Sequence, residues 1–211
     1  MSIYFVRAEG VPLEQRRGIE TIDRNILFIL VRASVESVAQ AFSTLKQMNV
    51  WVSDAYEREI DIHNESTFVF RFRGHPWSII YKPYTPSGRI YLTEEDACSV
   101  SESLSTSVIY YTGSDTCGTI EYHLYSNGDC VEKLSFEERI SLEFQSQLRQ
   151  VETRQIRRDA YTFTMNFICE QDAYIPCFVA VEDLTAGQHT TLGIEDLMPN
   201  EVERMDYLAQ Q

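Results

Sequence analysis

The chain has 211 residues, of which 44% are hydrophobic and 24% are charged, and its formal net charge is −14. That length and apolar content suffice for one domain with a sizeable core. The negative charge disfavours nucleic acid and anionic membranes as partners, because both require Lys and Arg to meet phosphates. The charge is compatible with a basic protein partner, and solubility alone would also account for it.

The sequence also gives evidence on the cellular compartment, through its terminal segment and its cysteines. The sequence contains no run of about 18 apolar residues that would predict a membrane-spanning helix. Its first ten residues lack the basic and apolar regions of a secretory signal. The five cysteines are scattered, without a C-x-x-C pair, at positions 98, 117, 130, 169 and 177. This pattern favours reduced thiols in a cytoplasmic protein.

The first half of the chain predicts strands around one helix. Residues 25–32 are a continuous apolar run, which is typical of a central strand buried on both faces. Ser34 is a candidate N-cap for a helix over 35–48, where apolar residues recur at helical spacing. We expect other strands at 2–7, within 51–62, and at 67–72 and 77–82.

The following segment repeats this order of elements. After a loop at 83–88, Thr93 and Asp96 can form a capping box for a helix over 94–104, and a strand follows at 107–112. Residues 25–82 and 77–136 therefore suggest a duplicated β-α-β-β unit, although their residues are not visibly similar. We expect a single domain over 1–211, because the loop is too short to separate two bodies.

A hairpin over 119–135 is the clearest element. Asn127 and Gly128 both tolerate positive φ, so a two-residue type I′ turn fits between the two strands and sets their register. That register places Ile120, Tyr122, Leu124 and Val131 on an apolar face. It places Glu121, His123, Tyr125, Cys130, Glu132 and Leu134 on the other face.

The last part of the chain, 137–211, is expected to be mainly helical. We predict a charged surface helix over 136–158 and a helix over 159–170, where the length favours a helix over a strand. Pro176 makes 173–181 an edge strand or an irregular segment. Asn200 and Glu203 can form a capping box for a short C-terminal helix. The predicted fold class is α+β, an antiparallel or mixed sheet with helices mainly on one face.

The strongest candidate site is the polar face of the hairpin. In the predicted register His123 and Glu132 lie opposite each other, about 5 Å apart at Cβ, and Glu121 is on the same face. A carboxylate beside an imidazole can orient it as a general base or as a metal ligand. The ordinary alternative is a solvated sheet face with a favourable cross-strand pair.

Cys117 is a second candidate, as a nucleophile with His123 or His75 as its base. Asp115 would oppose formation of the thiolate, and an ordinary turn accounts for the same residues. A metal site from these side chains and Cys130 lacks the close paired spacing that zinc sites usually show. We therefore assign no metal, no cofactor and no catalytic residue from the sequence.

The sequence contains no P-loop, G-x-G-x-x-G, H-E-x-x-H, G-x-S-x-G or EF-hand motif. We therefore expect a non-catalytic protein-interaction or regulatory module, inhibitor- or immunity-like, that binds a basic protein. Neither nucleic acid nor a membrane is expected as a partner, and the oligomeric state is left open. The alternative is a small hydrolase or metal-dependent enzyme that uses the face with His123, Glu132 and Glu121.

Overall fold

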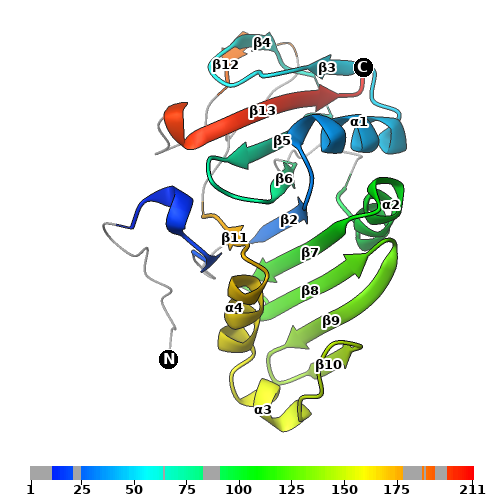
Figure 1. Cartoon of the computed structure of the whole chain (residues 1–211), viewed down its shortest axis with the longest axis vertical. Coiled ribbons are helices and arrows are strands. Elements are labelled where there is room, and N and C mark those ends of the chain that lie inside the picture. The colour runs from blue at the N-terminus through cyan, green and yellow to red at the C-terminus, as the bar shows by residue number, and fades with distance from the viewer. Residues whose placement is uncertain are drawn as a thin grey trace.

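A computed structural model describes residues 11–20, 25–63, 65–82, 91–177, 187, 189–192 and 199–211. Its main element is a nine-stranded antiparallel sheet with the strand order β10-β9-β8-β7-β2-β6-β5-β13-β3 (Figure 1). The strands are β2 (Ile26–Val31), β3 (Val50–Val52), β5 (Thr67–Phe72), β6 (Ser78–Tyr81), β7 (Ser107–Ser114), β8 (Thr119–Ser126), β9 (Asp129–Glu137), β10 (Ser141–Ser146) and β13 (Val202–Ala209).

Two helices, α1 (Val35–Lys46) and α2 (Glu94–Leu104), cover one face of the sheet. Both begin at the predicted caps. The Ser34 hydroxyl accepts a hydrogen bond from Ser37 N, and Thr93 and Asp96 form the expected capping box. Asp96 also pairs with Lys46, with 2.6 Å between Oδ1 and Nζ, so the end of α1 is tied to the start of α2.

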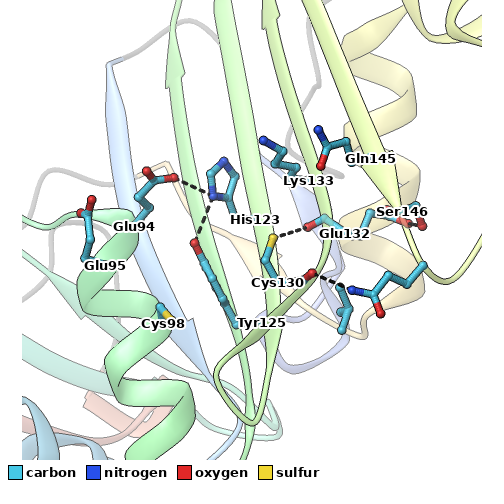
Figure 2. A pocket seen from close by; sticks show the side chains of 12 residues that line it. Glu94, Glu95, Cys98, His123, Tyr125, Cys130, Glu132, Lys133, Gln145 and Ser146 are labelled. Carbon is cyan, nitrogen blue, oxygen red and sulfur yellow. Dashed lines mark hydrogen bonds and ion pairs between the residues drawn. The ribbon is translucent and has the colours of Figure 1, made fainter.

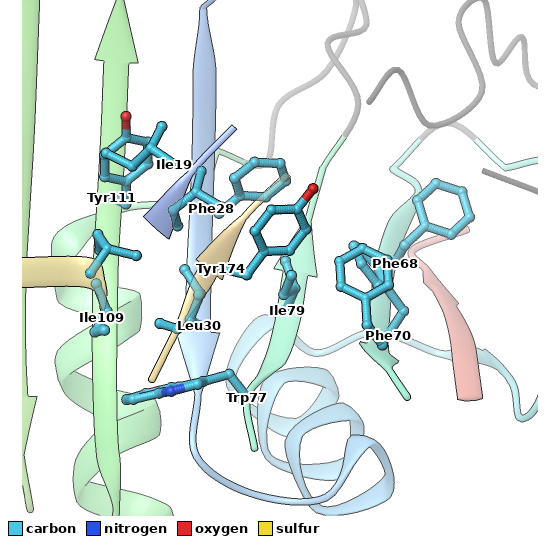
Figure 3. Packing of buried hydrophobic residues seen from close by; sticks show 14 of the residues in the cluster. Ile19, Phe28, Leu30, Phe68, Phe70, Trp77, Ile79, Ile109, Tyr111 and Tyr174 are labelled. Carbon is cyan, nitrogen blue, oxygen red and sulfur yellow. The ribbon is translucent and has the colours of Figure 1, made fainter. Parts of the chain in front are cut away.

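The opposite face carries a second layer, which includes α4 (Ala160–Glu170) and the short helix α3 (Thr153–Arg158). The layer also contains η1 (Leu13–Gln15) and the parallel pair β1 (Gly18–Ile19) and β11 (Tyr174–Ile175). Figure 3 shows Ile19 and Tyr174 of this layer near Phe28 and Leu30 of β2. The alternate residues of β2, Ile29 and Val31, pack under α1 and α2, which confirms that β2 is buried on both faces.

The remaining elements are a small antiparallel pair, β4 (Glu59–Asp61) and β12 (His189–Thr191), and η2 (Pro199–Glu201). No helix among the described residues is long and apolar enough to cross a membrane.

The strand predicted at 2–7 and the loop at 83–88 lie outside the described residues. The suggested duplication of 25–82 and 77–136 stays a prediction.

The predicted fold class is wrong in its C-terminal third and in its helix placement. The segment 136–158, which was predicted to be a helix, contains the strand β10. Half-buried and exposed residues alternate along β10, as they do in a strand that packs on one face only. The predicted C-terminal helix is β13, which pairs with both β5 and β3. Only 159–170 forms the expected long helix. Helices cover both faces of the sheet, and its strands are antiparallel throughout.

The hairpin turn has the predicted conformation, with φ of 53° at Asn127 and 88° at Gly128. The turn is docked against α2, because Gly128 N donates to Ser101 Oγ at 3.0 Å and Gly128 O accepts from Cys98 Sγ at 3.1 Å. A Cβ at Gly128 would lie 3.0 Å from the Cβ of Glu102. The turn therefore depends on glycine for both its backbone conformation and its close approach to the helix.

We expect Gly128→Ala to lower the free energy of unfolding by about 1–3 kcal/mol, because left-handed backbone strain and the contact with Glu102 add together. Gly187→Ala is the matched control, since Gly187 has a φ of 82° and a Cβ there would meet no heavy atom within 4 Å. It should cost about 1 kcal/mol. Urea unfolding of both variants measures the difference, and equal losses would contradict the close contact at Gly128.

Candidate functional site

A groove of about 610 Å³ lies between the first half of α2 and strands β8, β9 and β10. It opens on the side of the sheet that carries α1 and α2, beyond the edge of α2 (Figure 2). The residues that border it are Glu94, Glu95, Cys98, His123, Tyr125, Cys130, Val131, Glu132, Lys133, Gln145, Ser146 and Gln147. They include acidic, thiol, aromatic and amide types and one lysine, and the side chain of Glu132 itself points to the opposite side of the sheet.

His123 is a buried polar side chain at one end of the groove, and only 6% of its surface is exposed. Its Nδ1 lies 2.9 Å from Glu94 Oε2, and its Nε2 lies 2.8 Å from Glu121 Oε1. The hydroxyl of Tyr125 is 3.2 Å from the same Nδ1. Both ring nitrogens therefore lie within hydrogen-bond distance of a carboxylate.

The local sequence explains this arrangement. Alternation along β8 places Glu121, His123 and Tyr125 on one side of the sheet. The capping box at Thr93 starts α2 at Glu94, and Figure 2 shows this carboxylate pointing toward His123. The sequence placed His123 and Glu121 together correctly. It missed Glu94, because that contact joins a helix to a strand 29 positions away in the chain and no short motif encodes it.

The predicted pairing of His123 with Glu132 does not form. Ser126–Asp129 and Tyr125–Cys130 pair as expected, but Leu124 then pairs with Glu132 and His123 with Lys133. Val131 is thus an extra residue in β9, a β-bulge, and it moves Glu132 to the other side of the sheet. His123 and Glu132 therefore point in opposite directions.

Glu132 forms a separate, buried centre on the α4 side, where its side chain is 1% exposed. Its Oε1 accepts from Tyr122 Oη at 2.8 Å and from Arg149 Nη2 at 2.6 Å. Its Oε2 accepts from Ser146 Oγ at 2.6 Å and from Arg149 Nε at 2.9 Å. All strong acceptor positions of this carboxylate are occupied, so we interpret it as a structural centre.

This centre joins the edge of the sheet to α4. The guanidinium of Arg149 lies 4.7 Å from the ring centroid of Phe163 and also pairs with Glu170 at 3.0 Å. The ring of Tyr122 stacks on Phe167 with centroids 3.9 Å apart. Burial and then the neighbouring Glu132 raise the pKa of Tyr122, so its hydroxyl remains a donor. Sequence reasoning had no motif that could reveal this set.

The electrostatics of the groove are negative. Burial and then Glu121 and Glu94 raise the pKa of Tyr110, whose ring lies 5.7 Å from that of His123, to about 12. Burial also raises the pKa of the Cys98 and Cys130 thiols. Both thiols therefore remain protonated near neutral pH, which opposes a role as nucleophiles.

Cys117 lies on the surface, in the turn between β7 and β8, and its backbone N donates to Ser114 Oγ at 3.2 Å. His75 is in the opposite layer, where its Nε2 lies 2.8 Å from Leu13 O. Both nitrogens of His123 face Glu94 and Glu121. Each histidine that was considered as a base for Cys117 thus has other partners.

Comparisons with protein-family models, with curated proteins and with solved structures found no match for this chain. The candidate site is therefore judged from its own geometry.

Breaking the buried centre should destabilise the protein. We expect Glu132→Gln to lower the free energy of unfolding by about 2–4 kcal/mol, because Arg149 would lose its main partner. Glu152→Gln is the control, since Glu152 pairs with Arg154 on the surface and should contribute under about 0.5 kcal/mol. Denaturant unfolding measures both, and a loss at Glu132 no larger than at Glu152 would contradict the structural role.

His75 should make stability depend on pH. Its side chain lies between Phe72 and Tyr174, and burial lowers its pKa from the ordinary value of 6.5. Since the folded pKa is below the unfolded one, the unfolded state binds more protons as the pH falls through 6.5, and stability is lost. Thermal unfolding between neutral and mildly acidic pH should show a flatter dependence for His75→Gln than for the natural chain. Parallel curves would contradict this assignment.

Proposed function

We propose that this protein is a non-catalytic binding module, of an inhibitory or regulatory kind, that receives a basic segment of a partner protein in the cytoplasm. The binding surface is the groove between α2 and strands β8–β10. The observation that carries the proposal is the set of carboxylates at this groove: Glu94 and Glu95 line it from α2, and Glu121 reaches His123 at its end.

The balance of charge in the groove favours a cationic ligand. Lys133 is the one Lys or Arg among the described lining residues, and its Nζ already pairs with Glu143 at 2.7 Å. The α2 sequence contains no basic residue. Lys and Arg side chains of a partner would therefore be attracted to these carboxylates, whereas phosphates of a nucleic acid would be repelled.

The groove also has a shape suited to a peptide segment. It is bounded by the helix on one side and by the side chains of three strands on the other, with amide groups of Gln145 and Gln147 at the far wall. Amides can donate to and accept from a peptide backbone. The carboxylates of the groove would thus attract a basic peptide, and the neutral amides would position its backbone. Reduced thiols support the cytoplasmic assignment, since Cys98, Cys117, Cys130 and Cys169 are free.

The enzymatic alternative required His123 and Glu132 on one face, and the bulge at Val131 places them on opposite faces.

Binding of a fluorescent Lys/Arg-rich peptide, measured by anisotropy with a chelator present, tests the proposal. Glu95→Gln should weaken binding about two- to fivefold, because a single exposed charge contact contributes only modestly to affinity. Glu36→Gln is the matched control: like Glu95 it lies in the first turn of its helix and is exposed, but it does not line the groove. Both variants change the net charge equally.

Equal weakening in the two variants would show that the peptide senses only the total charge, and it would overturn the proposed groove. Absence of peptide binding to the natural chain at low salt would overturn the proposal altogether.

A further inference from the structure

The His123 end of the groove has the donor atoms of a metal site. Among the described residues, Glu94, Glu121 and His123 each offer a ligand atom, and these atoms lie within 4.8 Å of one another. An imidazole nitrogen combined with carboxylate oxygens is a donor set that zinc accepts. We propose that this end of the groove binds a zinc ion, with His123 Nδ1 and Glu94 as its protein ligands and Glu121 orienting the ring.

The distances suit this assignment. Nδ1 and Glu94 Oε2 are 2.9 Å apart. Two ligands of a tetrahedral zinc ion, each about 2.0 Å from the metal, are separated by about 3.3 Å. Glu94 can adjust by this amount, because its side chain is 48% exposed at the first position of α2.

Glu121 has the position of an outer partner. Its Oε1 lies 2.8 Å from Nε2, on the side of the ring away from Glu94. A carboxylate at this position accepts the Nε2 proton and leaves the lone pair of Nδ1 directed at the metal, as metal-binding histidines generally require. Glu121 therefore selects the tautomer without being a ligand itself.

The surroundings favour an open site. The Tyr125 hydroxyl, 3.2 Å from Nδ1, can donate to a metal-bound water. The adjoining cavity of about 610 Å³ has room for the waters that complete the coordination. Two protein ligands predict reversible binding rather than the permanent zinc of closed structural sites.

A second histidine provides an internal control. His189 also faces two carboxylates, with Nδ1 3.0 Å from Asp61 and Nε2 3.1 Å from Glu59. Its side chain is 58% exposed on the short pair β4–β12. The residue types thus match those at His123, but the burial and the groove are missing.

The test is zinc titration of the chelator-stripped full chain against a chromophoric zinc indicator. We expect one zinc ion per chain, with affinity lowered at least about tenfold by His123→Ala or Glu94→Gln and by a smaller factor by Glu121→Gln. His189→Ala should change affinity less than about twofold. Glu94→Gln is the decisive variant because it replaces an exposed side chain, and circular dichroism verifies that each variant folds.

Cobalt substitution identifies the ligands independently. The expected spectrum lacks a thiolate-to-cobalt charge-transfer band, because the proposed protein ligands are an imidazole and a carboxylate. A thiolate band, unchanged zinc affinity in Glu94→Gln, or an equal loss in His189→Ala would each overturn the proposal. Zinc binding does not depend on the basic partner, so its failure would leave the chelator-containing peptide assay unaffected.

Discussion

One extra residue in β9 determines how the polar side chains of the hairpin are divided between the two sides of the sheet. Val131 has no partner in β8, so every residue after it lies on the side opposite to that in a regular hairpin. Leu134 thereby enters the core under α4, and Lys133 enters the groove beside α2. The same shift separates Glu132 from His123 and creates two polar centres in place of one.

The two centres differ in what they can do. Glu132 is enclosed, and its two oxygens already accept from Tyr122, Ser146 and Arg149, so any ligand would have to break a satisfied network. His123 borders a cavity, and its carboxylate partners are themselves partly exposed. A partly exposed carboxylate can exchange one partner for another at a lower cost than a buried one. We therefore propose the His123 side as the binding surface, and we interpret the Glu132 side as a stabilising centre.

The features that the sequence predicted correctly are those with local causes. α1 and α2 follow from Ser34 and Thr93, whose caps act within four residues, and the hairpin turn follows from the positive φ of Asn127 and Gly128. The bulge was not predicted, although the local sequence contains a sign of it. In a regular register Leu134 would face solvent and Lys133 would face the core, and one inserted residue reverses both positions.

The features that were missed depend on distant parts of the chain. β13 is a strand because it inserts between β5 and β3, more than 120 positions earlier in the chain. The local pattern of Asn200 and Glu203 favoured a helix cap instead, and tertiary pairing overrode it. β10 carries Leu142 and Phe144 at a spacing of two, but the preceding Ile140 and following Leu148 also fit a helical spacing of four. Contact with β9 decides between the two.

The helical layers also determine where a ligand can reach the sheet. α1 and α2 cover the face above β2, β5 and β6, while α4, η1 and β1 lie on the reverse face. On the side of α2, the groove borders strands β8, β9 and β10. A basic segment and a zinc ion would both use the negative charge of this one surface, and Glu94 contributes to both. Each positive ligand would neutralise part of the charge that attracts the other, so by linkage each would weaken the other's binding by the same factor.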